Sequence, residues 1–173
     1  MTNTQLEHSH HDRAAKHNSC HLSLLLNDIE LASNIGSLFR ISDALGINHI
    51  YLCGSTSTPP NRKITKSSRS TEKYVPYSCE NDAVALLTSL KQQGHLVVSL
   101  EISSHSIPLT QFIAPKDKAI CLVIGSENEG VNQTLLNLSD QTVHIPMKGH
   151  NSSMNVANAC AIAAYDILNQ ISE

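Results

Sequence analysis

The C-terminal part of the chain gathers polar side chains at a place where chemistry could be done. In the segment "IPMKGHNSSMNVANACAIAAYDIL", residues 145–168, a strand-like start gives way to a Gly-containing turn and then to an Ala-rich helix. The polar side chains at this junction are Asn151, Ser152, Ser153, Asn155 and Asn158. One hydroxyl, from Ser152 or Ser153, suffices to cap the helix. We therefore expect either a plain helix cap or a cap combined with a ligand site.

A second candidate site is the turn in "VIGSENEG", residues 123–130, which follows an apolar strand. Parallel α/β sheets bind ligands where their strands end. The turn lacks the Gly-Lys-Ser/Thr of a P-loop and the G-x-G-x-x-G of a dinucleotide loop. Its Gly125 and Gly130 have no Cβ, which would let a ligand approach the backbone, and Glu127 adds a carboxylate. A plain strand-to-helix connection is the alternative interpretation.

The segment "NIGSLFR", residues 34–40, combines an amide and a guanidinium on one predicted helix. Asn34 stands at the helix start, near the end of the preceding strand. Arg40 comes six residues later on a different face, because each residue turns the helix by about 100°. A surface ion pair is the commonest role of a helical Arg, but Arg40 stands between the apolar Phe39 and Ile41.

The charge distribution indicates a nucleic-acid partner more clearly than the net charge of −3 does. Residues 62–73, "RKITKSSRSTEK", hold five Lys or Arg against one Glu, so they carry +4 and the remaining chain carries −7. Phosphate contacts are local and need few cations. A solvated loop is the alternative, and the candidate phosphate-binding residues are Arg62, Lys63, Lys66 and Arg69.

The elements that would position these residues alternate along the chain. Apolar runs predict strands, and helical spacing predicts helices between them, one capped by Ser33 or Asn34 and stopped by Gly46. Residues 54–73 are expected to form a long loop. This alternation predicts an α/β fold with five or six strands in a mostly parallel sheet flanked by helices. The expected strands lie within residues 21–28, 49–53, 95–102, 119–125 and 141–146.

The length of 173 residues predicts one domain, which we place at residues 21–173. Residues 1–20 are polar, and we expect them to form a disordered His-rich tail. Metal binding by this tract is the alternative, but the spacing of its His residues matches no defined metal site. No metal is therefore expected. No run approaches 18 apolar residues and no secretory signal is recognisable, so we expect a cytoplasmic protein without a membrane segment.

The five cysteines form no C-x-x-C pair, and their number is odd. Three of them stand in apolar runs. We expect reduced thiols packed as small apolar residues rather than a disulfide framework.

Together, the three polar segments resemble the SpoU-type, TrmH-like ribose 2′-O-methyltransferases of the SPOUT superfamily. Three motifs of that family occur here in order over residues 34–156. The first is matched by Asn34, Gly36 and Arg40; the second by Gly125, Glu127 and Gly130; the third by Ile145, Pro146, Met147, Gly149, Ser153, Asn155 and Val156. Met154 replaces the commoner Leu of the third motif, a change of similar volume.

The resemblance implies a fold and a cofactor that the residue pattern alone does not. The C-terminal segment would thread through a loop as a deep trefoil knot, although knots are otherwise rare. S-adenosylmethionine would bind in the knot loops. The implied cofactor-binding residues are Leu100, Gly125, Ile145, Met147, Ser153 and Met154.

The resemblance also implies a homodimer whose active site is built from both chains, and a substrate in tRNA or rRNA. The implied catalytic residues are Arg40, Asn34, Glu127, Ser153 and Asn155. The family proposal has Arg40 assist deprotonation of the ribose hydroxyl. A guanidinium is a poor base, so the alternative is that Arg40 holds a phosphate and stabilises the developing alkoxide. Arg69-Ser70-Thr71 stand where many members have a Gly-Ala pair, which leaves the target RNA open.

Two other kinds of protein remain as alternatives. One is a catalytically idle RNA-binding protein on the same fold, which would bind RNA without methyl transfer. The other is a flavodoxin-like protein, which would bind a flavin or nucleotide and not S-adenosylmethionine.

Overall fold

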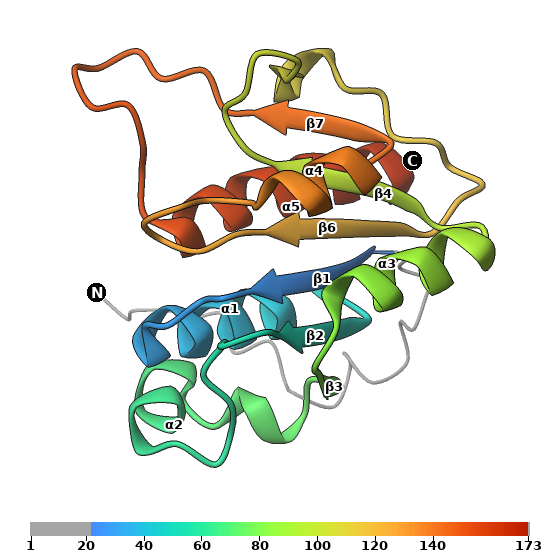
Figure 1. Ribbon diagram of the computed structural model, residues 1–173. Helices are drawn as coiled ribbons and strands as arrows, with labels where there is room; N and C mark the ends of the chain where they lie inside the picture. The colour runs from blue at the N-terminus through green and yellow to red at the C-terminus, as the bar shows by residue number, and fades with distance from the viewer. Residues whose placement is uncertain (1–21, 173) are drawn as a thin grey trace, which may run out of the picture.

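The computed structural model describes residues 22–172, which form one seven-stranded sheet with helices on both faces (Figure 1). The strands are β1 (Leu22–Asn27), β2 (His49–Cys53), β3 (Tyr77–Glu80), β4 (Leu96–Leu100), β5 (Ile107–Pro108), β6 (Ile120–Ile124) and β7 (Gln141–His144). The helices are α1 (Ala32–Leu45), α2 (Arg62–Ser68), α3 (Ala83–Gln92), α4 (Gln133–Leu138) and α5 (Val156–Ser172), with 3₁₀ turns η2 (Thr71–Lys73) and η3 (Leu109–Gln111). The tail expected at residues 1–20 lies outside the described residues.

The strand order β3-β2-β1-β6-β4-β7-β5 places a change of direction at the centre of the sheet. From β1 the chain moves outward to β2 and β3, and then returns to build the other half beyond β6. All paired strands in the described sheet are parallel, as the sequence predicted. In such sheets a crevice forms at the carboxyl ends of the strands near this change of direction.

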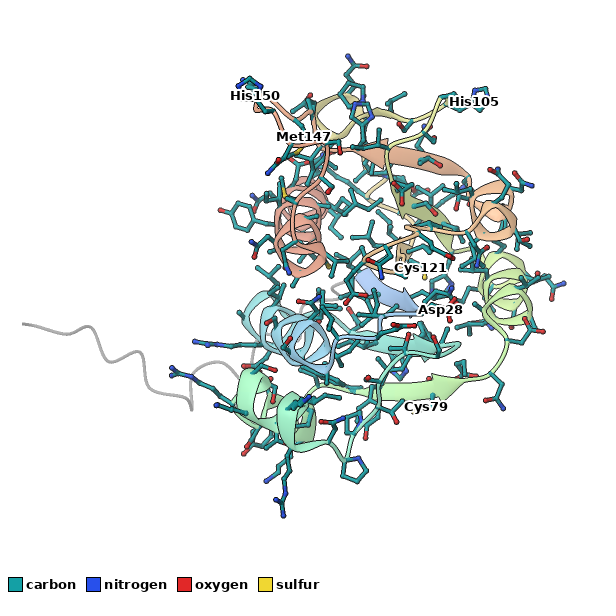
Figure 2. All side chains as sticks on the ribbon, turned by 60° about the vertical axis from the view of Figure 1, so that its left-hand side comes forward. Asp28, Cys79, His105, Cys121, Met147 and His150 are labelled. Carbon is teal, nitrogen blue, oxygen red and sulfur yellow. The ribbon has the colours of Figure 1, made fainter. Side chains whose placement is uncertain are left out.

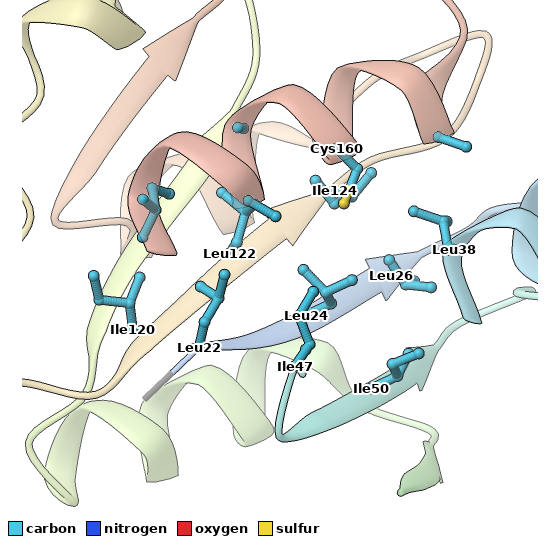
Figure 3. Packing of buried hydrophobic residues seen from close by; sticks show 14 of the residues in the cluster. Leu22, Leu24, Leu26, Leu38, Ile47, Ile50, Ile120, Leu122, Ile124 and Cys160 are labelled. Carbon is cyan, nitrogen blue, oxygen red and sulfur yellow. The ribbon is translucent and has the colours of Figure 1, made fainter. Parts of the chain in front are cut away.

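Strand β1 is buried along its whole length because helices cover both of its faces. Leu22, Leu24 and Leu26 pack in the layer formed with α1 and α5, where α5 lies over β6 and β1 (Figure 3). Leu25 points to the opposite layer and packs with Leu87 of α3. This explains the near-continuous apolar run that predicted a buried strand.

The predicted helix in residues 33–47 is present, but the expected cap is wrong. Helix α1 begins at Ala32 after Leu31, and no side chain caps it. Asn34 lies within the first turn and is buried, so its amide bonds to distant groups instead of the local backbone. At the other end Gly46 takes a left-handed conformation with φ of 68°, as predicted for a helix stop.

Two strands and a helix of the structure were not predicted from the sequence. The strand β3 has a polar sequence, "YSCE", and β5 has only two residues. The expected long loop at residues 54–73 contains α2, capped by Asn61, whose side chain accepts the Lys63 N–H at 2.9 Å. This helix buries only Ile64 and Ser68, which is too little to produce an apolar period in the sequence.

Helix α2 packs against α1 at Gly36. A Cβ added to Gly36 would overlap the Ser67 hydroxyl and lie 2.5 Å from the Ile64 carbonyl oxygen. The backbone of α2 therefore approaches α1 so closely that only glycine fits. Because α2 carries Arg62, Lys63 and Lys66 of the 62–73 segment, the close packing at Gly36 fixes where these three residues lie relative to α1.

Three of the described cysteines, Cys53, Cys121 and Cys160, are buried and free, and Cys79 is exposed. Burial raises the pKa of each of the three buried thiols to about 12, so they stay protonated at neutral pH. This agrees with the expected apolar role. No helix in the described part of the chain is long and apolar enough to cross a membrane. Residues 22–172 also contain no group of three or more His, Cys, Asp or Glu placed to hold a metal ion.

We predict that Gly36→Ala lowers the free energy of unfolding by about 1–3 kcal/mol, although alanine is the better helix former, because α2 must move away from α1. Urea unfolding followed by circular dichroism measures this. The neighbouring Ser37→Ala is the matched control and should change the free energy by less than about 0.5 kcal/mol. Equal effects of the two substitutions would contradict close packing at Gly36.

Candidate functional site

A cavity of ≈ 1200 Å³ opens at the carboxyl ends of β4, β6 and β7. The start of α1, the turn after β6 and the loop between β7 and α5 complete its wall. Figure 2 shows Met147 and His150 on this last loop, which projects beyond the sheet. Every residue predicted to bind the cofactor lies in the wall, namely Leu100, Gly125, Ile145, Met147, Ser153 and Met154.

The turn after β6 is closed by its own backbone. The Ser126 N–H donates to the Gly130 oxygen at 3.1 Å, and the Gly130 N–H donates to the Ser126 oxygen at 3.0 Å. A Cβ on Gly125 would overlap the Gly130 backbone, and Gly130 has a φ of 70°. The protein itself needs the missing Cβ atoms, because its own atoms fill the space that a Cβ would take. Both glycines also line the cavity, so the expectation that a ligand approaches their backbone stays a prediction.

Glu101, which was not predicted as a site residue, holds this turn against the end of β4. One carboxylate oxygen accepts the Val131 N–H at 2.8 Å and the other accepts the Ile102 N–H at 2.8 Å. A Cβ on Gly130 would overlap this carboxylate. The available signal was an acidic residue immediately after an apolar strand, a position where loop N–H groups need acceptors.

Asn34, Glu127 and Asn155 form a chain of hydrogen bonds that joins the three polar segments. The Asn34 amide donates to Glu127 at 2.8 Å, and its oxygen accepts from the Asn155 amide at 3.0 Å. Glu127 also accepts the N–H groups of Glu30 at 3.3 Å and Leu31 at 3.4 Å. Three predicted catalytic residues thus meet at one place, where their polar groups hold the site together.

The helix cap expected from Ser152 or Ser153 comes from Asn155 instead. The Asn155 side-chain oxygen accepts the N–H of Ala157 at 3.0 Å and that of Asn158 at 3.3 Å. Asn155 lies immediately before α5, whereas Ser152 and Ser153 are too far from the first turn to cap it. Ser153 is exposed and lies in the cavity wall, so its hydroxyl remains free to meet a ligand.

The structure leaves the predicted cations outside this cavity. Arg40 is exposed on α1 and is not in the wall. Among the described residues that line the cavity none is Lys or Arg, whereas Glu101, Glu127 and Glu129 are present. The candidate RNA-binding residues are all exposed on α2 and at its C-terminal end, namely Arg62, Lys63, Lys66 and Arg69.

We predict that Asn155→Ala lowers the free energy of unfolding by about 1–3 kcal/mol, because it removes both the cap and the bond to Asn34. Asn155→Ser keeps a capping oxygen but cannot reach Asn34, so its effect should be smaller. Urea unfolding of both variants separates the two contributions. Ser153→Ala is the control. If it lowers the free energy of unfolding as much as Asn155→Ala does, Ser153 rather than Asn155 caps the helix.

Solved structures with this fold are described as RNA methyltransferases. The SpoU methyltransferase AviRb from Streptomyces viridochromogenes in complex with AdoMet has a TM-score of 0.77 and 26% identity, over 87% of this chain and 61% of that chain. A structure described as concerning the 2-OH methylation of C/U34 on tRNA has a TM-score of 0.75 and 25% identity, over 87% of this chain and 96% of that chain.

Curated relatives carry similar descriptions at low identity. The 23S rRNA (guanosine(2553)-2′-O)-methyltransferase RlmP of Bacillus subtilis is 27% identical over 83% of this chain and 56% of its own length. An uncharacterized tRNA/rRNA methyltransferase of Mycobacterium tuberculosis is 30% identical over 82% of this chain and 48% of its own length. The chain thus spans about half the length of these relatives.

A family model is matched by most of the chain. The model described as the SpoU rRNA Methylase family covers residues 21–165, which include all three motif segments. This match confirms the resemblance and makes the flavodoxin-like alternative wrong. The chain therefore belongs to the SpoU methylase family.

Proposed function

We propose that this protein transfers a methyl group from S-adenosylmethionine to a ribose 2′-hydroxyl of tRNA or rRNA. The observation that carries the proposal is the cavity at the strand ends, whose wall joins all three family motifs through Asn34, Glu127 and Asn155. Membership of the SpoU family supports the activity, and the AdoMet complex of AviRb supports the cofactor.

The cavity suits the cofactor in size and in chemistry. Its ≈ 1200 Å³ exceeds the roughly 300–1,000 Å³ of usual ligand pockets, which leaves room for a nucleotide beside the cofactor. Leu100, Ile145 and Met154 offer apolar contacts for a purine ring, and the loop backbones offer hydrogen bonds. When bound, S-adenosylmethionine would supply an electrophilic methyl group, and the residues of the wall would hold it in place.

We further propose that the chain is knotted, with its C-terminal segment threaded through a loop formed by an earlier part of the chain. The path of the chain supports this. After β7, near one edge of the sheet, residues 145–155 lead back to α5, which packs over β6 and β1 at the centre (Figure 3). Gln170 near the end of α5 accepts the Ala114 N–H at 2.9 Å, which ties the helix to the connection between β5 and β6.

A second copy of the chain is proposed to complete the active site. The cavity of one described chain has three Glu and no Lys or Arg, yet an RNA phosphate and a developing alkoxide both favour a cation. Arg40 is exposed on α1 and free to reach the cavity of a partner. The outer face of α5 carries Ile162 at 45% exposure and Tyr165 at 59%, a suitable apolar contact between copies.

The residues divide into positioning groups and groups that would meet the substrate. The positioning groups form hydrogen bonds with one another and with the backbone, and they are Asn34, Glu127 and Asn155. The free Ser153 hydroxyl would orient the ribose. Arg40 would hold a phosphate and stabilise the developing alkoxide as the hydroxyl proton passes to a water molecule and the methyl group moves from sulfur to the 2′-oxygen.

The choice of the 2′-oxygen and of the RNA rests on relatives. The relative from Bacillus subtilis is described as a 2′-O-methyltransferase of 23S rRNA, which supports the ribose and an rRNA target. The structure described for methylation of C/U34 on tRNA matches over 96% of its own length, which supports a tRNA target. Both RNAs are therefore to be tested.

The proposed activity predicts micromolar binding of S-adenosylmethionine in a calorimetric titration and transfer of its labelled methyl group to unfractionated tRNA or rRNA. Alkaline hydrolysis then tests the position, because cleavage requires a free 2′-hydroxyl. A 2′-O-methylated nucleotide should remain in a labelled dinucleotide, whereas label in mononucleotides would contradict ribose methylation. RNA binding without any transfer would favour the catalytically idle alternative.

The shared site predicts complementation between two inactive variants. Arg40→Ala should abolish transfer while preserving cofactor binding, and Met154→Arg should fill the cavity and block the cofactor. When the two are mixed equally and allowed to exchange, half of the dimers are mixed and each has one intact site. Activity should therefore recover to about a quarter of the wild-type value. Failure to recover any activity, with exchange verified, would place Arg40 in its own chain's site.

A further inference from the structure

The acidic residue of the basic 62–73 segment is buried within it. Glu72 is 9% exposed, although the segment carries five Lys or Arg and a local charge of +4. Its carboxylate accepts hydrogen bonds from the Thr65 hydroxyl at 2.9 Å and from the Ser68 hydroxyl. Both donors belong to α2, whereas Glu72 belongs to η2. Glu72 thus ties the two helical turns together.

The chain between these turns adopts a conformation that its residues disfavour. Arg69 has a φ of 54° and Ser70 a φ of 68°, so two consecutive residues with a Cβ are left-handed. The Ser70 N–H donates to the side-chain hydroxyl oxygen of Ser68 at 3.0 Å, and this hydroxyl in turn donates to the Glu72 carboxylate. The carboxylate therefore holds the strained turn through a single intervening hydroxyl.

The carboxylate stays ionised in this place. Burial raises the pKa of Glu72, but the hydrogen bonds from Ser68 and Thr65 lower it, and the result lies below the usual value. A charged acceptor forms stronger hydrogen bonds than a neutral one, which suits a group that must hold a turn closed.

We propose that Glu72 is a positioning residue for RNA, which keeps the left-handed Arg69–Ser70 turn closed and so sets the directions of Lys66 and Arg69. This inference rests on the proposed function, in which these cations contact RNA phosphates. Arg69 is itself in the strained turn, and Lys66 lies in the last turn of α2 just before it. Release of the turn would move both cations relative to the phosphates that they contact.

Two roles of Glu72, as a positioning residue or only as a negative charge, predict opposite changes in RNA affinity when the carboxylate is neutralised. If Glu72 acted only as a negative charge, Glu72→Gln would raise the local charge from +4 to +5 and strengthen RNA binding. If Glu72 positions the cations, the same change weakens RNA binding despite the more favourable charge.

The test uses the full chain and unfractionated tRNA, with the dissociation constant measured over a series of salt concentrations. We expect Glu72→Gln to weaken tRNA binding by about tenfold while the affinity for S-adenosylmethionine is unchanged. Asp43→Asn, which neutralises an exposed carboxylate on α1, is the charge control and should leave binding equal or stronger. Unchanged or tighter tRNA binding by Glu72→Gln overturns the proposal, and so does a parallel loss of cofactor binding.

A double-mutant cycle tests whether Glu72 acts through the turn. Glycine adopts positive φ without strain, so Ser70→Gly should reduce the effect of Glu72→Gln several-fold. Equal effects of Glu72→Gln in both backgrounds would overturn the proposal. If Glu72→Gln does not fold, Ser68→Ala is the deciding variant. It keeps the charge of Glu72 but removes the hydroxyl that joins Glu72 to the Ser70 N–H, so it should also weaken tRNA binding.

A charge-removal variant separates this inference from the proposed function. Lys66→Ala combined with Arg69→Ala should lower the salt slope of tRNA binding, while Lys116→Ala combined with Lys118→Ala, on the chain before β6, should not. If the first pair has no effect, the proposed RNA surface fails. If it weakens binding but Glu72→Gln does not, only the role of Glu72 fails.

Discussion

The site depends on one carboxylate that satisfies polar groups from distant parts of the chain. Glu127 accepts from Asn34, 93 residues away, and from two N–H groups of the loop after β1, while Asn34 accepts from Asn155 across 121 residues. Asn34 is buried, and a buried polar group is costly unless it is paired, so its hydrogen bonds to Glu127 and Asn155 favour one arrangement of the three segments. The cavity wall exists because that arrangement is fixed.

The hydrogen bonds among these polar groups limit which groups of the cavity wall can contact a ligand. The side chains of Asn34, Glu127 and Asn155 are hydrogen-bonded to one another. The protein also fills the space that a Cβ would take on Gly125 or Gly130. What remains for ligands is backbone, apolar side chains, the Ser153 hydroxyl and exposed polar side chains such as Asn128, Glu129 and Asn151, none of them a Lys or Arg. A cavity of this kind can bind and orient a cofactor, but it needs a cation from elsewhere to hold a phosphate, which is why a second chain enters the proposed mechanism.

The sequence predicted those features that depend on local pattern. Leu22, Leu24 and Leu26 made β1 recognisable, and Gly46 marked the end of α1 because its left-handed conformation is a local requirement. The cap of α1 was wrong because Asn34 has a partner 93 residues away, which no local rule reveals. Helix α2 was not predicted because it buries only Ile64 and Ser68, which is too little to produce an apolar period in the sequence.

The spacing of the first motif follows from the geometry of α1. Asn34 points toward Glu127 and the cavity, and Gly36 lies where α2 touches the helix. Four residues turn a helix by about 400°, so Arg40 lies about 40° from Gly36 and one turn further along, on the side that faces α2. One helix thus sets the cavity, the basic helix and the exposed guanidinium at fixed distances from one another. In the proposed mechanism, Arg40 and the cations of α2 would therefore be offered to RNA from the same side of α1.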